Sequence, residues 1–274
     1  MPVEVKVLEK RNNYVKFIIS GVPVAFVNSL RRTIIAEVPV MAIDEVVILD
    51  NTSVMYDEVL AHRLALIPLK TDLESYVLPE ECVCGGIGCS RCQVKLVLDV
   101  EAKDGDLMVY SGHLKSEDPA IVPVSDKIPI VKLAKGQRIV LEAYARLGRG
   151  RDHAKWQPGL AAYKYMPKIV IDESKCNGCG VCVQNCPRNV LEIKDGKVTV
   201  SKLLDCNLCR YCEIVCPTKA IRVEHEDSTY VFFVESFGQL DVKTLVLKAL
   251  EVLDQKCVKF LEECEHAIEE FKKE

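Results

Sequence analysis

The sequence predicts an α+β fold in three parts. Strand-like alternation and helical repeats occupy both ends of the chain, short strands and loops fill its middle, and most cysteines gather in three groups of four. We expect residues 1–46 and 225–274 to form one discontinuous sheet-and-helix domain, residues 47–167 an inserted mainly-β domain, and residues 168–224 a small cysteine-rich domain. A length of 274 residues with 49% hydrophobic residues is ample for such packed cores.

Charge and hydropathy argue against two broad classes of protein. The formal net charge of −4 gives no global basic field, so we expect no direct sequence-specific binding of nucleic acid. The first residues, "MPVEVKVLEK", lack the apolar core of a signal peptide, and no stretch reaches the roughly 18 apolar residues of a membrane helix. We therefore expect a cytoplasmic protein without a membrane partner.

The N-terminal segment predicts a hairpin followed by a helix. "VEVKVLEK" and "YVKFIISG" alternate around "RNN", and a proline then opens "VAFVNSLRRTIIAEV", a helical run that a second proline ends. Phe26, Leu30 and Ile34 share one face of this helix. Arg31 and Arg32 cannot both lie on that face.

The first cysteine group is "CVCGGIGCSRC". Its glycines let so short a loop fold back on itself, and four thiolates suit tetrahedral zinc in a closed structural site. The predicted zinc ligands are Cys82, Cys84, Cys89 and Cys92. A reduced loop without metal is the alternative, because C-x-C is a less diagnostic spacing than paired C-x-x-C.

The rest of the middle region does not predict an active site. "VKLVLDVEAKDGDLMVYSGHL" predicts a hairpin that turns at Asp104-Gly105, and the histidines are dispersed at His62, His113 and His153. The loop "YARLGRGRDHAKWQP" holds the only tryptophan, Trp156, and four cations, Arg146, Arg149, Arg151 and Lys155. Taken alone, this loop fits either a phosphate-binding patch or an exposed basic loop.

The other two cysteine groups read C-x-x-C-x-x-C-x-x-x-C-P, the run of bacterial ferredoxins. Three thiolates of such a run reach one four-iron cluster, and the fourth points away toward the neighbouring cluster. The first predicted ligand set is Cys176, Cys179, Cys182 and Cys216, and the second is Cys206, Cys209, Cys212 and Cys186. We therefore expect two [4Fe–4S] clusters, with eight free or zinc-bound thiols as the alternative.

Predicted strands surround these runs. "KIVID" precedes the first, "AIRVEHE" follows the second, and "LEIKDGKVTV" between them predicts a hairpin that turns at Asp195-Gly196. Gly178 and Gly180 let the backbone turn around the first cluster, whereas the second run has Leu208 and Arg210 there. Because so small a domain buries little apolar surface, we expect iron–thiolate bonds to hold it together, with or without electron transfer.

The C-terminal segment "DVKTLVLKALEVLDQKCVKFLEECEHAIEEF" predicts one long helix with its N-cap at Asp241. A heptad seam runs along it through Val246, Leu250, Leu253, Cys257, Phe260, Cys264, Ala267 and Phe271. About 30 helical residues span roughly 45 Å, more than a small domain needs to cover its own core. We expect part of this seam to bind another subunit, with packing wholly within the chain as the alternative.

Four separated segments together resemble one known family. They are "FVNSLRRTIIAEVPVMAIDEV" at 26–46, "EVLAHRLALIPL" at 58–69, "GRGRDHAKWQPG" at 148–159 and "FVESFGQLDVKTLVLKALEVL" at 233–253. The chain resembles the D-subunit family of archaeal DNA-directed RNA polymerase nearly from end to end, including a ferredoxin-like insertion that some members carry. That family is similar to the N-terminal part of the bacterial polymerase alpha subunit and to eukaryotic counterparts, some of which carry a four-cysteine zinc loop.

The resemblance implies a non-catalytic assembly platform. The discontinuous, alpha-subunit-like domain would pair with the small subunit L, and the heterodimer would recruit subunits N and P and then dock the large catalytic subunits. Carried over, the heterodimer interface would comprise the seam from Val246 to Phe271 and the helix with Phe26, Leu30 and Ile34. The paired arginines Arg31 and Arg32 would face neighbouring subunits, or solvent, and the basic loop would contact a large subunit.

Two function classes remain. The first is a structural polymerase subunit whose iron–sulfur clusters stabilise or regulate assembly. The second is a ferredoxin-type electron-transfer protein with a large docking domain. We expect the first, because an electron carrier needs neither a long apolar seam nor the polymerase motifs.

Overall fold

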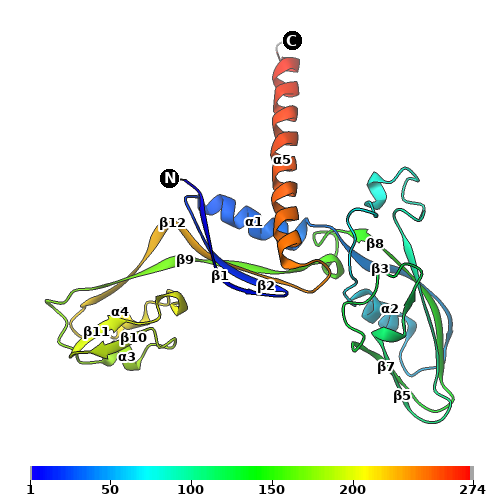
Figure 1. Ribbon diagram of the computed structural model, residues 1–274, viewed down its shortest axis with the longest axis horizontal. Helices are drawn as coiled ribbons and strands as arrows, with labels where there is room; N and C mark the ends of the chain where they lie inside the picture. Colours follow the sequence, from blue (N-terminus) through cyan, green and yellow to red (C-terminus); the bar gives the residue numbers. More distant parts are fainter. Residues whose placement is uncertain (1, 272–274) are drawn as a thin grey trace. The chain divides into compact units, whose positions relative to one another are not determined.

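The computed structural model describes residues 2–271, which divide into two compact units (Figure 1). The first unit comprises the described residues through Lys10, together with Val15–Asn28 and Ala162–Phe233. The second comprises Arg11–Tyr14, Ser29–Ala161 and the described residues from Val234 onward. The strands form several separate sheets, and the helices lie in other segments of the chain. The predicted α+β class is therefore confirmed. The domain limits expected from the sequence stay a prediction.

The first unit contains most of a four-stranded sheet in the order β1-β2-β12-β9. Its strands are β1 (Glu4–Arg11), β2 (Tyr14–Ser20), β9 (Gly159–Ile171) and β12 (Ile221–Ser236). Because β1 and β2 are neighbours, the predicted N-terminal hairpin is confirmed. Aromatic rings join the strands of this sheet. Phe17 stacks on Phe232 with 5.3 Å between ring centroids, and Tyr163 meets Tyr230 edge-on at 5.8 Å.

The two ferredoxin-type runs lie in a part of the first unit that comes between β9 and β12 in the sequence. This part holds α3 (Val181–Gln184), β10 (Leu191–Lys194), β11 (Lys197–Val200) and α4 (Tyr211–Ile214). Strands β10 and β11 pair, and Asp195 and Gly196 between them have φ of 51° and 74°, as a two-residue hairpin turn requires. The predicted turn at Asp195-Gly196 is therefore confirmed. We call this part, from Asp172 to Ala220, the cysteine-rich subdomain.

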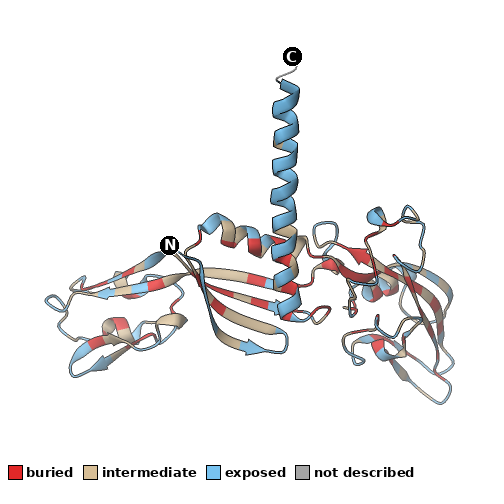
Figure 2. Cartoon of the chain, turned by 45° about the horizontal axis from the view of Figure 1, so that its top comes forward, coloured by how far each residue is buried: buried red, intermediate tan, exposed pale blue. Residues whose placement is uncertain are grey.

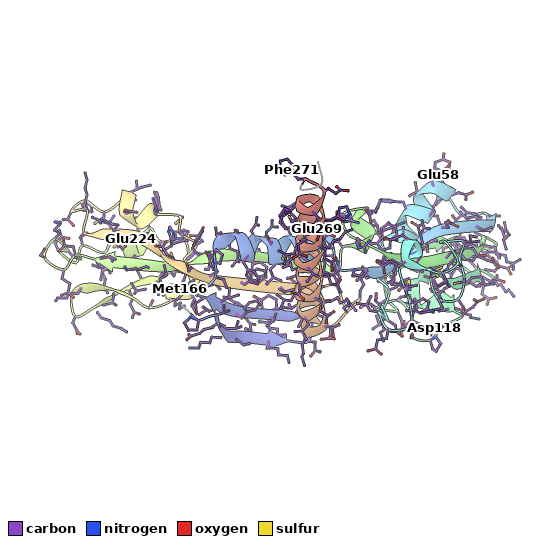
Figure 3. All side chains as sticks on the ribbon, turned by 90° about the horizontal axis from the view of Figure 1, so that it is seen from above. Glu58, Asp118, Met166, Glu224, Glu269 and Phe271 are labelled. Carbon is purple, nitrogen blue, oxygen red and sulfur yellow. The ribbon has the colours of Figure 1, made fainter. Side chains whose placement is uncertain are left out.

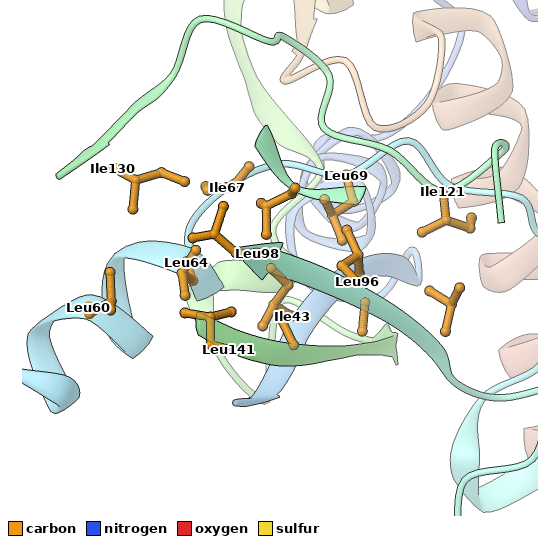
Figure 4. Packing of buried hydrophobic residues seen from close by; sticks show 14 of the residues in the cluster. Ile43, Leu60, Leu64, Ile67, Leu69, Leu96, Leu98, Ile121, Ile130 and Leu141 are labelled. Atoms are coloured by element: carbon orange, nitrogen blue, oxygen red, sulfur yellow. The ribbon is translucent and has the colours of Figure 1, made fainter. Parts of the chain in front are cut away.

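The second unit is built on a sheet in the order β3-β8-β4-β6. Its strands are β3 (Val40–Asn51), β4 (Val94–Glu101), β6 (Lys115–Ser116) and β8 (Arg138–Gly148). A second sheet joins β5 (Leu107–Tyr110) to β7 (Pro129–Leu133), and α2 (Asp57–Ala65) lies against β3. Strand β4 buries every second residue. Figure 4 shows Leu64 of α2 directed toward Leu98 of β4 and Leu141 of β8, at the centre of this core.

The hairpin expected across Asp104-Gly105 is wrong. Strands β4 and β5 flank this turn, but β4 pairs with β8 and β6, whereas β5 pairs with β7. Beyond β4, the Ala102 N–H donates to the Gln137 carbonyl and the Ala102 carbonyl accepts from the Gly136 N–H. Strand β8 therefore pairs along one edge of β4 and β6 pairs with Leu96 and Val97 on the other, whereas β5 lies in a separate sheet.

The two helices predicted near the ends of the chain are α1 (Val24–Ala36) and α5 (Val242–Phe271). Asp241 caps α5, because its Oδ1 accepts the N–H groups of Lys243 and Thr244 at 3.0 and 3.1 Å. The Thr244 hydroxyl and these N–H groups lower the pKa of the Asp241 carboxyl. The predicted N-cap is therefore confirmed. None of the helices that the structure describes is long and apolar enough to cross a membrane.

Candidate metal centres and partner-binding surface

The four-cysteine loop closes on itself just before β4. The Sγ atoms of Cys82, Cys84, Cys89 and Cys92 all lie within 4.8 Å of one another. Cys84 lies 3.4 Å from Cys82 and 3.5 Å from Cys92 between sulfurs. A Zn–S bond of about 2.3 Å places tetrahedral sulfurs about 3.8 Å apart. The four thiols therefore have the spacing of a single tetrahedral ion.

The surroundings of Cys84 and Cys92 shift the pKa values of their thiols in opposite directions. Backbone N–H groups of Gly88 and Cys89 lower the pKa of the Cys84 thiol to about 5, so Cys84 is a thiolate at neutral pH. Burial raises the pKa of Cys92 to about 12, so this thiol keeps its proton unless a metal displaces it. The donor set fits zinc and offers no open position for a substrate.

The fourth cysteine of each ferredoxin-type run has the same surroundings. The Val190 N–H donates to the Cys186 sulfur at 3.4 Å, and the Ala220 N–H donates to the Cys216 sulfur at 3.3 Å. In both runs the donor lies four residues after the cysteine. Hydrogen bonds to sulfur stabilise the thiolate form that ligates iron, so the two runs are built as repeats of one site.

The turns within the two runs also match. Gly178 and Gly180 have φ of 69° and 74°, and the corresponding Leu208 and Arg210 have φ of 60° and 59°. A side chain in this left-handed region costs roughly 1–2 kcal/mol. The second run therefore has the same left-handed turns as the first, but Leu208 and Arg210 adopt them at a steric cost that glycine does not have.

The buried thiols reveal which cysteines lie together. Burial raises the pKa of Cys182, and three neighbouring thiolates raise it further, those of Cys216, Cys176 and Cys179. The pKa of Cys212 is raised to about 11, mainly by burial. The negative charges of the Cys186, Cys206 and Cys209 thiolates also raise it. In each case the neighbours are the other three members of one predicted ligand set, including the cysteine that crosses over from the other run.

A cavity lies at the second predicted set. It measures about 20 Å³, and its lining includes Cys186, Cys206, Cys209 and Cys212 beside the apolar side chains of Ile169, Val190, Leu191 and Val223. A four-iron cluster holds its thiolates farther apart than a single ion does. Among residues 2–271, only the 82–92 loop brings three or more ligands to single-ion spacing. That the eight cysteines hold two four-iron clusters stays a prediction.

We expect Gly178→Ala to destabilise the cysteine-rich subdomain by about 3 kcal/mol. Its φ of 69° already disfavours a side chain, and the added Cβ would lie 2.2 Å from the Gly196 carbonyl oxygen. Gly85→Ala is the control, since Gly85 has a φ of 67° but open space around it, and it should cost only about 1 kcal/mol. Urea unfolding of both variants measures the difference, and equal losses would contradict the steric argument.

Lys164 of β9 is a functional candidate that sequence motifs missed. Its Nζ donates to the carbonyls of Leu204 and Cys206 at 2.6 and 2.7 Å, on the turn that leads into the second run. Burial lowers the pKa of this ammonium, and the charge of Lys16 on β2 lowers it further. A lone lysine some forty positions from its partners carries no sequence signal, so only tertiary structure identifies it.

The basic loop is held by ion pairs within its own unit. Arg149 contacts Glu80 at 2.5 Å and Glu81 at 3.3 Å, on the turn just before the four-cysteine loop, and Arg151 contacts Glu37 at 3.2 Å. Because the guanidinium groups already contact carboxylates, a phosphate would have to compete with these pairs. The phosphate-binding interpretation of this loop therefore loses support.

Asp44 of β3 fixes the other end of the loop. Its carboxylate pairs with both Lys155 and Arg146, and the side chains of Lys155 and Asp44 are only 9% and 12% exposed. The Lys155 ammonium also lies 4.3 Å from the centroid of the Trp156 ring, whose Nε1 donates to the Arg146 carbonyl at 3.2 Å. The loop is thus a packed structural element with a nearly buried ion pair.

Replacing Asp44 by asparagine should lower the free energy of unfolding by about 3 kcal/mol, because it leaves the Lys155 ammonium nearly buried without its carboxylate. The control is Asp99→Asn. Its partner Arg138 is 44% exposed, so this loss should stay below about 1 kcal/mol. Parallel chemical denaturation measures both values. Equal stability of the two variants would show that the Asp44 pair contributes no more than a surface contact.

Most of the predicted seam on α5 is not covered by the chain itself. The buried residues of α5 are Val242, Leu245 and Ala249, all in its first turns. Farther along, Phe260 is 67% exposed and Phe271 is 82% exposed, and Figure 2 shows the helix pale blue over most of its length. Figure 3 looks down α5 from its C-terminal end, where Glu269 and Phe271 are labelled. The alternative that the seam packs wholly within its own chain is therefore wrong for the residues that the structure describes.

Helix α1 offers less surface than expected. Leu30 and Ile34 are 3% and 0% exposed within the chain, so they are core residues. Phe26 and Arg31 are half-buried and Arg32 is exposed. The residues of α1 that are exposed in the chain alone are Val24, Ala25, Ser29 and Arg32.

Comparison with known proteins adds a family to this architecture. Residues 44–174 match the family described as RNA polymerase Rpb3/RpoA insert domain, and residues 169–192 match the 4Fe-4S binding domain. Over 265 residues the chain is 45% identical to the DNA-directed RNA polymerase subunit Rpo3 of Methanosarcina acetivorans, which covers 95% of this chain and 98% of the relative. The chain belongs to the archaeal Rpo3 family. Rpo3 subunits of Pyrobaculum arsenaticum and Archaeoglobus fulgidus are 49% and 45% identical, over 94% and 98% of this chain and 95% and 99% of their own lengths.

Rpo3 is another name for the D-subunit family, so the resemblance inferred from four sequence segments is confirmed, and the protein is a subunit of DNA-directed RNA polymerase. The insert-domain match covers the four-cysteine loop and the basic loop. The iron–sulfur match covers the first cysteine run, from Cys176 to Cys186. The Rpo3 chain thus carries a recognised iron–sulfur motif within a polymerase subunit, and its partners include other polymerase subunits.

Proposed function

We propose that this chain is the non-catalytic assembly subunit of its polymerase and that α5 receives a smaller subunit. The observation that carries the proposal is the seam of α5, which stays open from Leu250 to Phe271 in the chain alone. A continuous apolar helix face is stable in water only when another surface covers it. We take subunit L as the occupant, with subunits N and P and the large catalytic subunits joining afterwards. Nucleotide addition then occurs on other chains, in the cytoplasm.

Affinity purification of the tagged chain from its own cells, under anaerobic conditions, tests this proposal. We expect the large polymerase subunits and a small L-like subunit to be recovered together. Recovery of redox enzymes without polymerase would instead support the electron-transfer alternative. The end-to-end similarity to Rpo3 subunits argues against that alternative, because a ferredoxin accounts for only the cysteine-rich subdomain.

We further propose that the chain holds two [4Fe–4S] clusters that stabilise or regulate assembly. The crossing-over of Cys186 and Cys216 supports the ligand sets, and the small apolar interior of the subdomain supports a structural role. If iron loss unfolds the subdomain, Cys176→Ser or Cys206→Ser should weaken recovery of the whole polymerase. The pair with the small subunit should persist, because α5 lies outside the cysteine-rich subdomain. Unchanged recovery of the polymerase would leave the clusters without an assembly role.

The 82–92 loop is proposed to hold one structural zinc. We expect Cys89→Ser to lower bound zinc from about one per chain to near zero, since three thiolates bind zinc much more weakly than four. Iron content should not change, because the loop and the ferredoxin-type runs lie in different units. Elemental analysis of the purified chain gives both numbers. Zinc retained at the parental level in Cys89→Ser, or absent from the parent, would contradict the assignment.

A further inference from the structure

We propose that the first unit contains a binding site for a small oxyanion of the phosphate class, beside the second cysteine run. A pocket of about 440 Å³ is lined by Lys16, Lys164, Pro187, Arg188, Asn189, Leu204 and Asp205. Three of these side chains are cations and one is a carboxylate, which leaves a net charge of +2 facing the pocket. A charge of this sign and size, in a hollow lined by polar groups, suits a dianion.

The three cations come from separate segments of the chain. Lys16 lies on β2, Lys164 lies on β9 and Arg188 lies in the turn after α3. Folding has brought these three like charges to one pocket, where they repel one another and only one carboxylate, that of Asp205, faces them. An anion among the three groups would remove this repulsion.

The donor geometry suits an anion with several oxygens. Lys164 uses two of its three N–H donors for the carbonyls of Leu204 and Cys206, so one donor stays available. Arg188 is exposed, and its planar guanidinium can bind two oxygens of one anion. Asn189 adds a side-chain amide to the lining. A monocarboxylate would neutralise only half of the net charge, whereas phosphate or pyrophosphate would neutralise it fully.

The site lies where it can position the second cysteine run. Arg188 and Asn189 follow Cys186, whereas Leu204 and Asp205 precede Cys206. An anion held by Arg188, Lys164 and Lys16 would tie both of these segments to the sheet strands β2 and β9. This consequence rests on the proposed iron–sulfur function, but the anion site itself does not.

Equilibrium dialysis of the anaerobically purified full chain against labelled inorganic phosphate tests the site, in excess chloride at constant ionic strength. We expect saturable binding of about one phosphate per chain and competition by pyrophosphate but not by equal acetate. Arg188→Gln and Lys16→Gln should each weaken binding about tenfold, the loss of one charge-assisted hydrogen bond. Lys202→Gln is the matched control, because Lys202 is an exposed lysine near the turn but outside the pocket.

Competition by ATP distinguishes two sources of the same chemistry. Stronger competition by ATP than by phosphate would indicate nucleotide phosphates, and the reverse would indicate the free anion, and both support the site. Absence of saturable binding, equal competition by acetate, or unchanged binding in Arg188→Gln would overturn it. Iron is counted on every sample, and only variants with the parental iron content are compared. A parent chain without iron would refute the proposed clusters whatever the phosphate result.

Discussion

Replacing Cys216 by serine is expected to remove the same cluster as replacing Cys176, although the two cysteines belong to different runs. The reason is the arrangement around the buried thiol of Cys182, whose neighbours include Cys216 from the second run as well as Cys176 and Cys179 from the first. Each variant should lose about four of eight irons, since four thiolates hold a cluster of this type and each variant removes one of them. Iron and sulfide analysis, with electron paramagnetic resonance of the reduced protein, measures the loss and identifies the remaining cluster.

The reciprocal pair gives the matched control. Cys186→Ser and Cys206→Ser should both remove the second cluster and leave the first. Their resonance spectrum should therefore differ from the spectrum shared by Cys216→Ser and Cys176→Ser. If each run instead held its own cluster, Cys216→Ser would give the same spectrum as Cys206→Ser. The experiment therefore tests the ligand assignment itself and not only the presence of iron.

The sequence predicted the parts of this protein whose chemistry is local. Cysteine spacing identified the 82–92 loop and the two ferredoxin-type runs, because a short loop leaves few ways to bring four thiols together. Asp241 predicted the start of α5, because an N-cap depends only on the next three residues. The Asp195-Gly196 turn was equally predictable, since a two-residue hairpin needs the positive φ that these residues tolerate.

Features that depend on contacts between distant segments were missed or misassigned. The strand after Asp104-Gly105 pairs with β7, whereas β4 pairs with β8 and β6, and no local pattern records which distant strand becomes the partner. Helix α2 was not predicted, although Asp57 in its first turn and Arg63 in its last turn are suitable end residues. Its two buried leucines, Leu60 and Leu64, make too short a periodic pattern to identify a nine-residue helix. Similarly, the spacing of Leu30 and Ile34 showed that they share a face, but not that the chain itself buries them.

Phe260→Asp is expected to weaken binding of the small partner subunit at least 100-fold while leaving this chain folded. Phe260 lies at the middle of the exposed part of the seam and is 67% exposed in the chain alone, so an aspartate there meets water in the free protein. In the complex the same carboxylate would be buried against an apolar surface without a partner. A hot-spot loss of about 3 kcal/mol corresponds to roughly 100-fold in affinity.

Gln255→Asp separates the effect of position from the effect of charge. Gln255 is exposed on the same helix and, at 100° per residue, lies nearly opposite the seam, so this variant carries the added negative charge on the wrong face. Co-expression with the small subunit followed by size-exclusion chromatography measures complex formation, and circular dichroism shows whether α5 is retained. If both variants lose the partner, charge repulsion explains the result. If neither does, the partner does not bind along the seam, and the exposed phenylalanines Phe260 and Phe271 must serve another contact.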